Sequence, residues 1–120
     1  MNEQAVYAMK LTKVYPLLVA KAERKGRTQQ EADAVIRWLT GYDSAGLAAQ
    51  LERDVDYGTF FREAPRLNPA WQQITGTICG CRIEAIQDPL MRQIRVLDKL
   101  IDQLAKGKPL DTILMKEEGK

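Results

Sequence analysis

Residues 88–108 read DPLMRQIRVLDKLIDQLAKGK and contain the clearest helix pattern in the sequence. Asp88 is a favoured N-cap residue, and Pro89 stands at the first helical position, where a missing N–H matters least. Gly107 is the kind of residue that most often ends a helix. We therefore predict a helix over residues 89–106. Its apolar residues alternate spacings of four and three along one side of the helix: Leu90, Ile94, Leu97, Ile101 and Leu104.

This helix has a wide apolar face. Met91, Leu100 and Val96 extend it beyond the seam that a two-helix coiled coil buries, which favours a place in a domain core. Charged residues three or four positions apart are expected to pair on the solvated side, where they support the helix and form no site. These pairs are Arg95 with Asp98, Lys99 with Asp102, and Asp102 with Lys106.

A second amphipathic pattern predicts a helix over residues 12–25. Thr12 can cap it, and Pro16 falls in its first turn, where proline is tolerated. Gly26 supplies a left-handed stop. The apolar stripe recurs at helical spacing: Leu11, Val14, Tyr15, Leu18 and Ala22.

The motif Thr28-Gln-Gln-Glu31 is a capping box, in which the hydroxyl and the carboxylate each bind a free backbone N–H at the start of a helix. It predicts a helix over about residues 29–40, which Gly41 ends. Two shorter helices are expected next. Asp43 or Ser44 can cap the first, which carries Leu47, Ala48 and Leu51; Asp56 can cap the second, which carries Phe60, Phe61 and Ala64 and is stopped by Pro65.

The segment after Pro65 allows two interpretations. Asn68 and Pro69 repeat the cap-then-proline signature and predict a fifth helix through Trp71, Ile74 and Ile78. Residues 74–83, ITGTICGCRI, are instead rich in β-branched residues and glycine, which favours a strand, with residues 4–9 as its partner. Pro109 begins a last short turn that holds Leu110, Ile113 and Leu114.

The expected fold is a mainly α, compact single-domain bundle of five to six helices, with a minor short β element near residues 4–9 and 74–83 as the open alternative. The domain would span residues 1–120, with an ordered core over about 6–114 and a frayed tail over 115–120. A chain of 120 residues that is 45% hydrophobic can close one core of this kind.

Composition excludes several classes of function. The net charge of +2 is far below the basic bias usual in proteins that neutralise phosphates. The chain has no histidine, which removes catalysis by Ser/His or Cys/His pairs and His-ligated metals. A zinc site needs more ligands than Cys79 and Cys81 supply. We therefore expect both cysteines to be reduced and to lie in the core, and we expect no metal and no cofactor.

The first residues, MNEQAVYAMK, lack the basic and apolar regions of a secretory signal, so we expect a cytoplasmic location and no membrane association. The expected partner is a second copy of the chain or another protein. Nucleic acid is a disfavoured alternative. Residues 29–40, the Gly41 turn and the next helix have a helix-turn-helix layout, but SAGLAAQLERD offers small residues where bases would be read.

Five stretches of the chain resemble one family of small bacterial proteins, known as domain-of-unknown-function family two-thousand-two-hundred. The resemblance runs from about Val6 to Lys116 and implies no activity, substrate, cofactor or catalytic residue. The stretches that carry it are VYPLLVAKAERKGRT, IRWLTGY, TFFREAPRLNP, ITGTICGCRI and DPLMRQIRVLDKLIDQLAKGK.

One cationic segment is a candidate anion-binding site, because it leads into the exposed N–H groups at the start of the helix over 29–40. The simpler interpretation is that these cations oppose the dipole of the preceding helix and stay solvated. The candidate residues are Lys21, Arg24, Lys25, Arg27 and Thr28.

Two other groups of residues could form sites. Asp54 and Asp56 are close enough to suggest a cation, but a loop and a helix cap explain them better. A set of amphipathic rings could line a groove for a ligand or peptide, although core edges are the simpler explanation. These rings are Tyr7, Tyr15, Tyr42, Tyr57, Trp38 and Trp71.

The sequence therefore predicts a small helical binding or assembly module without catalytic activity. Anion or nucleic-acid-backbone binding through residues 21–28 is one alternative. An enzyme that uses carboxylate, lysine and tyrosine groups as acid and base is the other.

Overall fold

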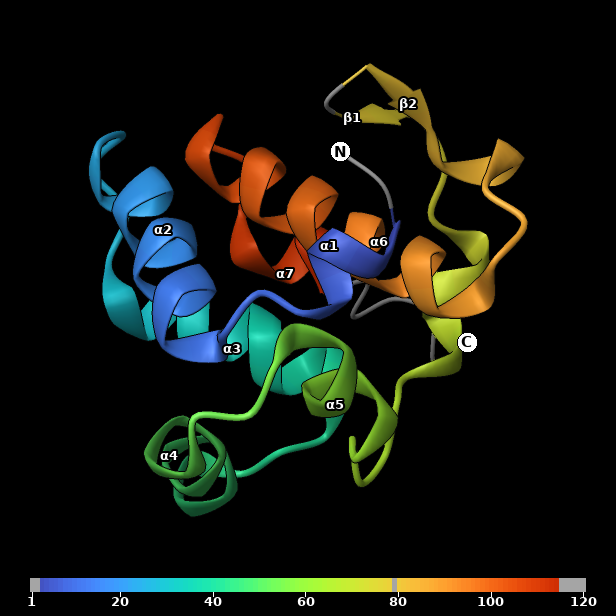
Figure 1. The fold of residues 1–120 in the computed structure, drawn as a ribbon. Helices are drawn as coiled ribbons and strands as arrows, with labels where there is room; N and C mark the ends of the chain where they lie inside the picture. The colour runs from blue at the N-terminus through green and yellow to red at the C-terminus, as the bar shows by residue number, and fades with distance from the viewer. Residues whose placement is uncertain (1–2, 79, 115–120) are drawn as a thin grey trace.

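The computed structural model describes residues 3–78 and 80–114, and helix α6 (Pro89–Ala105) runs through the middle of it (Figure 1). The Asp88 carboxylate accepts a hydrogen bond from the Leu90 N–H at 3.2 Å, with Pro89 at the start of the helix. Gly107 follows the end of the helix in a left-handed conformation. The predicted helix over 89–106 and both of its end signals are confirmed.

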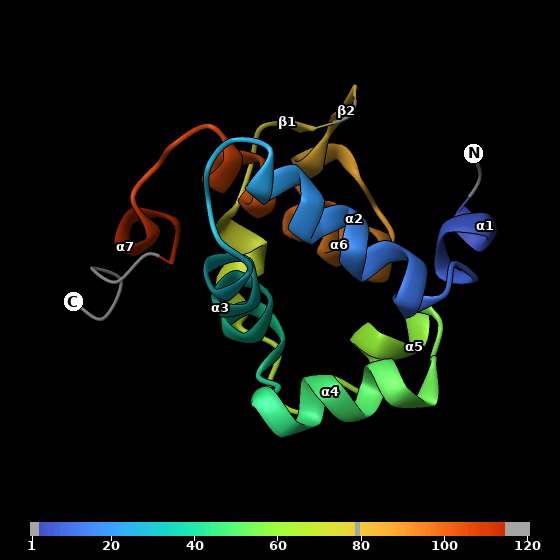
Figure 2. The same ribbon diagram turned by 90° about the vertical axis from the view of Figure 1, so that its left-hand side faces the viewer.

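The other helices pack around α6 because its apolar face is wide. Helices α2 (Leu11–Glu23), α3 (Gln29–Thr40), α5 (Tyr57–Arg62) and α7 (Leu110–Ile113) all contact it. Figure 2 shows α4 (Ser44–Arg53) at the edge of this group, between α3 and α5. The α6 side chains that are at most 1% exposed form the centre of the core: Ile94, Val96, Leu97, Leu100, Ile101 and Leu104.

Helix α2 begins one residue earlier than predicted, and Thr12 does not cap it. Lys10 holds the cap position, and the Thr12 hydroxyl donates instead to Asp54 Oδ1 at 2.7 Å. Pro16 consequently lies inside the helix and not in its first turn. The predicted stop is confirmed: Gly26 has φ of +84°, and Arg27 N donates to the Ala22 carbonyl at 3.0 Å.

The capping box of α3 is present as predicted. Glu31 N donates to Thr28 Oγ1 at 3.1 Å, and Thr28 N donates to Glu31 Oε1 at 2.9 Å. Gly41 ends the helix with φ of +84°. Local hydrogen bonds within four residues determine this start, which is why the sequence alone could predict it.

The caps of the two shorter helices are also confirmed. Asp43 Oδ1 accepts from Gly46 N at 2.6 Å, and Asp56 Oδ1 accepts from Thr59 N at 2.7 Å. The predicted end of the second helix was wrong. Helix α5 stops at Arg62, so Ala64 lies beyond it and the end comes three residues before Pro65.

The fifth helix was predicted too long. A short 3-10 helix, η1 (Pro69–Gln73), follows the confirmed Asn68 cap, and the chain then forms a hairpin of β1 (Thr77–Ile78) and β2 (Cys81–Arg82). Gly76 and Gly80 have φ of +113° and +78°, which a continuing helix cannot adopt. A second 3-10 helix, η2 (Ile83–Ala85), leads toward α6.

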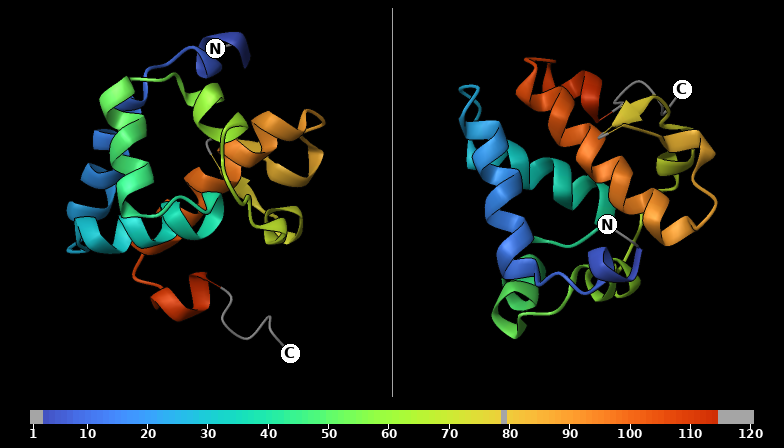
Figure 3. Two further views of the ribbon diagram at one scale, coloured as in Figure 1. Left: turned by 90° about the horizontal axis from the view of Figure 1, so that it is seen from below. Right: turned by 45° about the horizontal axis from the view of Figure 1, so that its top comes forward.

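The strand alternative is therefore confirmed only in part, because its partner was wrong. Ile78 pairs with Cys81 inside the same segment, whereas the proposed partner residues 4–9 begin in helix α1 (Glu3–Tyr7). The right-hand view of Figure 3 shows the hairpin and α2 on opposite sides of α6. Pairing between residues this close in the sequence needs no distant partner strand.

The mainly α fold class is confirmed, with seven α-helices among the described residues where five to six were predicted. The difference arises from α1 and α7, which have only five and four residues. Cys81 is an exposed free thiol, so its expected burial in the core was wrong. The prediction for Cys79 and that of a frayed tail over 115–120 concern positions outside the described residues.

Candidate functional site

Some residues of the predicted anion site make contacts within the protein, and the others are exposed to solvent. Lys21 Nζ lies 3.3 Å from Asp102 Oδ1, and Thr28 is occupied by the capping box. Arg24 and Lys25 are exposed at the end of α2. Anion binding by this segment stays a prediction.

Arg27 has an internal structural role that the sequence did not indicate. Its Nη2 lies 2.9 Å from Glu31 Oε2. Its Nη1 donates to the carbonyl oxygens of Leu104 and Lys108 at 3.3 and 3.0 Å. A cation is well suited to the free carbonyls at the end of a helix, so Arg27 joins the start of α3 to the end of α6.

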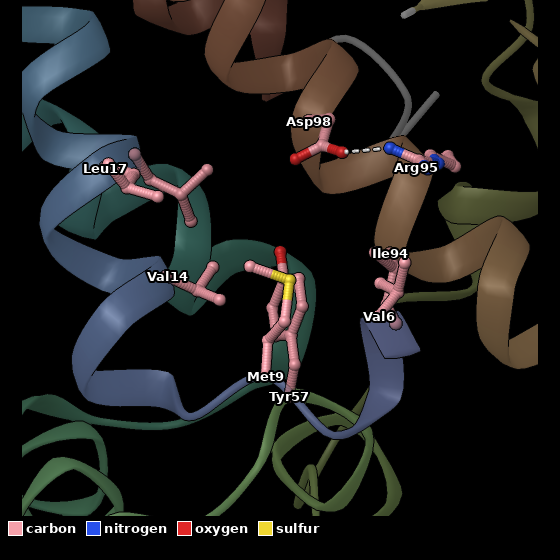
Figure 4. A pocket seen from close by; sticks show the side chains of 9 residues that line it. Val6, Met9, Val14, Leu17, Tyr57, Ile94, Arg95 and Asp98 are labelled. Carbon is pink, nitrogen blue, oxygen red and sulfur yellow. Dashed lines mark hydrogen bonds and ion pairs between the residues drawn. The ribbon is translucent and has the colours of Figure 1, made fainter. Parts of the chain in front are cut away.

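A more enclosed feature lies between α1, α2, α5 and α6, and we call it the α2–α6 pocket (Figure 4). Its volume of about 320 Å³ is at the lower end of the range usual for small-molecule sites. Most of its wall is apolar, and the polar groups come from α5 and α6. The lining residues are Val6, Met9, Val14, Leu17, Leu18, Tyr57, Ile94, Arg95 and Asp98.

A backbone bridge positions two of these side chains. Leu11 N donates to the Val55 carbonyl at 2.8 Å, and Tyr57 N donates to the Met9 carbonyl at 2.7 Å. The bridge joins the start of α2 to the start of α5, where Asp56 caps the helix. Met9 and Tyr57 thus meet at one end of the pocket, as Figure 4 shows.

Tyr57 is only 3% exposed, and its hydroxyl has no hydrogen-bond partner within residues 3–78 and 80–114. A buried hydroxyl without a partner is unusual, since leaving it unpaired destabilises a protein by about 1–3 kcal/mol. Burial raises the pKa of Tyr57 well above its ordinary value. The hydroxyl therefore stays protonated at neutral pH and can donate or accept a hydrogen bond.

Arg95 and Asp98 form the polar side of the pocket. Arg95 Nη1 lies 3.2 Å from Asp98 Oδ2, and the two side chains are 22% and 21% exposed. Burial raises the pKa of Asp98, and the charge of Arg95 opposes that shift. The predicted pair is confirmed, but it lines a cavity instead of lying on a solvated surface. The predicted pair of Lys99 with Asp102 was wrong, because Lys99 Nζ donates to the Thr77 carbonyl at 3.1 Å.

The comparisons with known proteins concern nearly the whole chain. Residues 5–115 match the family described as "Uncharacterized protein conserved in bacteria" (DUF2200). The chain belongs to this family. The DUF2200 chain is also similar to the crystal structure of uncharacterized protein SP1917, with a TM-score of 0.90 and 52% identity over 98% of this chain and 96% of that one. No curated protein matches it.

These findings confirm the family predicted from the five sequence stretches, and they add no activity. Among the described helices of the DUF2200 chain, none is both long and apolar enough to cross a membrane. No group of three or more potential metal ligands occurs in the part of the chain that the structure describes. Asp54 follows the last residue of α4, and Asp56 precedes the first residue of α5, which it caps as predicted.

The pocket of the DUF2200 chain can bind an amphipathic molecule. Its walls can cover an apolar group, and its polar side offers a hydroxyl and an ion pair. The sequence predicts Tyr57 as one of six rings that could line a groove. It predicts Arg95 and Asp98 as an ion pair on the solvated side of the helix. The elements that pack against a helix come from distant parts of the sequence. The spacing of charged residues on one helix therefore could not show which pair is buried by another element.

Arg27 and Glu31 lead to a prediction about acid stability. The hydrogen bond from Arg27, together with the Thr28 N–H, lowers the pKa of Glu31 from 4.5 to about 2. A carboxyl with a lowered folded-state pKa stabilises the protein above its unfolded pKa, and this stabilisation is lost as the pH falls from about 4.5 toward 2. Glu31→Gln should therefore lose less stability than wild type between pH 6 and pH 3.

Urea unfolding at the two pH values measures this difference. Glu52→Gln, which removes an exposed carboxyl of α4, serves as the control and should keep the wild-type pH dependence. An equal loss of stability in Glu31→Gln and wild type would contradict the role assigned to this pair.

Proposed function

We propose that this protein is a non-catalytic binding domain whose α2–α6 pocket takes a small amphipathic molecule. The observation that carries the proposal is the Tyr57 hydroxyl, which is buried against an apolar cavity and unpaired among the described residues. A ligand that hydrogen-bonds this group would remove its desolvation penalty. The apolar wall would contribute roughly 25 cal/mol for each Å² of ligand surface that it covers.

Three features favour binding over catalysis. The raised pKa of Tyr57 makes the hydroxyl a poor base at neutral pH. Asp98 is held in an ion pair with Arg95. The chain has no histidine to supply a group that titrates near neutrality.

A fragment screen by protein-observed NMR tests the proposal, with a matched pair of variants. Val14→Phe adds a ring inside the pocket, whereas Leu90→Phe adds a ring to a more open surface near Asp88. Amphipathic fragments should shift the resonances of Tyr57 and Ile94 in wild type and in Leu90→Phe, and not in Val14→Phe. Binding that is unaffected by Val14→Phe, or a screen without hits at these residues, would reject the proposal.

The unpaired hydroxyl predicts an unusual change in stability. Tyr57→Phe removes a buried polar atom without a partner and should raise the free energy of unfolding of the unliganded protein by about 1 kcal/mol. Tyr42→Phe is the control. The Tyr42 hydroxyl donates to the Phe60 carbonyl at 2.7 Å, so its removal should lower the free energy of unfolding by about 1 kcal/mol. Urea denaturation measures both, and destabilisation by Tyr57→Phe would contradict the assignment.

Cellular location and self-association are two further properties predicted from the sequence. We propose a cytoplasmic location, supported by the exposed free thiol of Cys81, which suits a reducing compartment. We also propose self-association, and light scattering of the eluted protein over a concentration series measures it. A constant monomer mass would reject self-association and leave the pocket proposal unaffected.

A further inference from the structure

The polar lining of the α2–α6 pocket includes two hydrogen-bond acceptors, the Asp98 carboxylate and the Tyr57 oxygen, beside the Arg95 guanidinium. Asp98 Oδ2 is paired with Arg95, and in Figure 4 the second carboxylate oxygen is turned toward α2. An ionised carboxylate can only accept hydrogen bonds, and it has more acceptor sites than one arginine N–H fills. The phenolic oxygen of Tyr57 adds a second acceptor, and in Figure 4 it lies at the end of the ring nearer to Asp98.

Both cations near Asp98 are already paired with carboxylates, Arg95 with Asp98 and Lys21 with Asp102. In the view of Figure 4 the Arg95 guanidinium lies on the far side of Asp98 from α2, so the carboxylate stands between it and the α2 wall. Lys21, on α2, is the second cation that acts on Asp98, and its ammonium is paired with Asp102 at 3.3 Å. The acceptor atoms are therefore the groups best placed to meet a ligand.

The charges that act on Tyr57 also favour a cationic ligand. Burial is the main cause of the raised pKa of Tyr57, and the Asp98 charge raises it further, by more than Arg95 lowers it. Of these two charges, the Asp98 carboxylate therefore acts on the phenolic oxygen more strongly than the Arg95 guanidinium does. A positively charged donor is favoured at such a point, and it would gain more in this partly buried site than in water.

We propose that the ligand of the α2–α6 pocket is a small organic cation, a primary amine with an apolar body, whose ammonium group binds between the Asp98 carboxylate and the Tyr57 oxygen. This inference rests on the proposed binding function and adds the ligand class to it. The ammonium supplies three N–H donors, enough for both acceptors. The apolar body lies along Val14, Leu18 and Ile94, and the exposed Leu17 stands at the pocket lip.

Three probes of the same length test the ligand class on the full chain. Hexylamine, hexanol and hexanoate differ only in the terminal group, and titration followed by NMR at pH 7 measures their affinities. Hexylamine should bind about tenfold more tightly than hexanol, and hexanoate should bind most weakly. This series uses the wild-type protein and does not depend on the folding of any variant.

Asp98→Asn tests which group recognises the amine. It should reduce hexylamine affinity about tenfold and so remove the preference for hexylamine over hexanol. Asp111→Asn removes the same charge from an exposed position on α7 and should keep the wild-type preference. A preference for amines that survives Asp98→Asn in a folded protein would overturn the role of Asp98.

The outcomes separate this inference from the proposed function. If hexanol or hexanoate binds as well as hexylamine at the residues of the pocket, the cation inference fails and the binding function stands. If none of the three probes binds and the fragment screen also finds no ligand there, both fail.

Discussion

Replacing Phe60 with alanine is expected to lower the free energy of unfolding by about 3–5 kcal/mol, which is a large part of the stability of a domain of this size. Phe60 is 1% exposed, and its ring stacks on Tyr42 with centroids 4.8 Å apart. It also meets Phe61 edge to face at 5.6 Å. Truncation removes these contacts and leaves a cavity that the surrounding helices can fill only in part.

Urea unfolding of Phe60→Ala and Leu17→Ala measures this effect against a control. Leu17 is 62% exposed, so its truncation should change the free energy of unfolding by less than about 1 kcal/mol. Two variants of equal stability would mean that the aromatic group around Phe60 is not part of the core.

Gly41→Ala is the second substitution expected to have a large effect. Gly41 has φ of +84°, and a Cβ atom there would lie 2.6 Å from Arg66 Cβ and 2.7 Å from the Arg66 carbonyl oxygen. The chain approaches this closely because Arg66 N donates to the Thr40 carbonyl at 3.1 Å, at the end of α3. Alanine would have to adopt a left-handed conformation and also displace this segment.

Gly26→Ala is a matched control for the same substitution. Gly26 has the same φ of +84°, but a Cβ atom there would have none of the described atoms within 4 Å. It should lose about 1–2 kcal/mol through the backbone conformation alone, and Gly41→Ala should lose about 1–3 kcal/mol more. Urea midpoints of the two variants give the difference. Equal losses would show that the segment at Arg66 moves away from the new Cβ atom at no cost in free energy.

The helix starts were predictable because the interactions that make them are local. The carboxylates of Asp43, Asp56 and Asp88 each bind an N–H two or three residues later, and the Thr28 box is equally short-range. Prediction failed at Thr12, where a side chain from another part of the chain, Asp54, takes the hydroxyl that was expected to cap α2.

The candidate site was predictable only in its parts. The pairing of Arg95 with Asp98 follows from their spacing on one helix, and Tyr57 belonged to the set of rings that could line a groove. Their meeting in one pocket depends on α2 and α5 packing against α6, and on α1 packing against α5. Likewise, Arg27 was an anion-binding candidate by sequence, and the fold directs it to the carbonyl groups at the end of α6.

Local signals in the sequence predict the mainly helical fold class, most helix starts and the wide apolar face of α6, because caps, glycine stops and 3.6-residue periodicity act over a few residues. Three outcomes did not follow from these signals: residues 77–78 pair with residues 81–82, the Tyr57 hydroxyl is buried without a partner among the described residues, and Asp98 lines a cavity. The last two outcomes depend on which distant elements pack together. Burial of apolar surface favours that packing, and the local spacing of residues does not specify it.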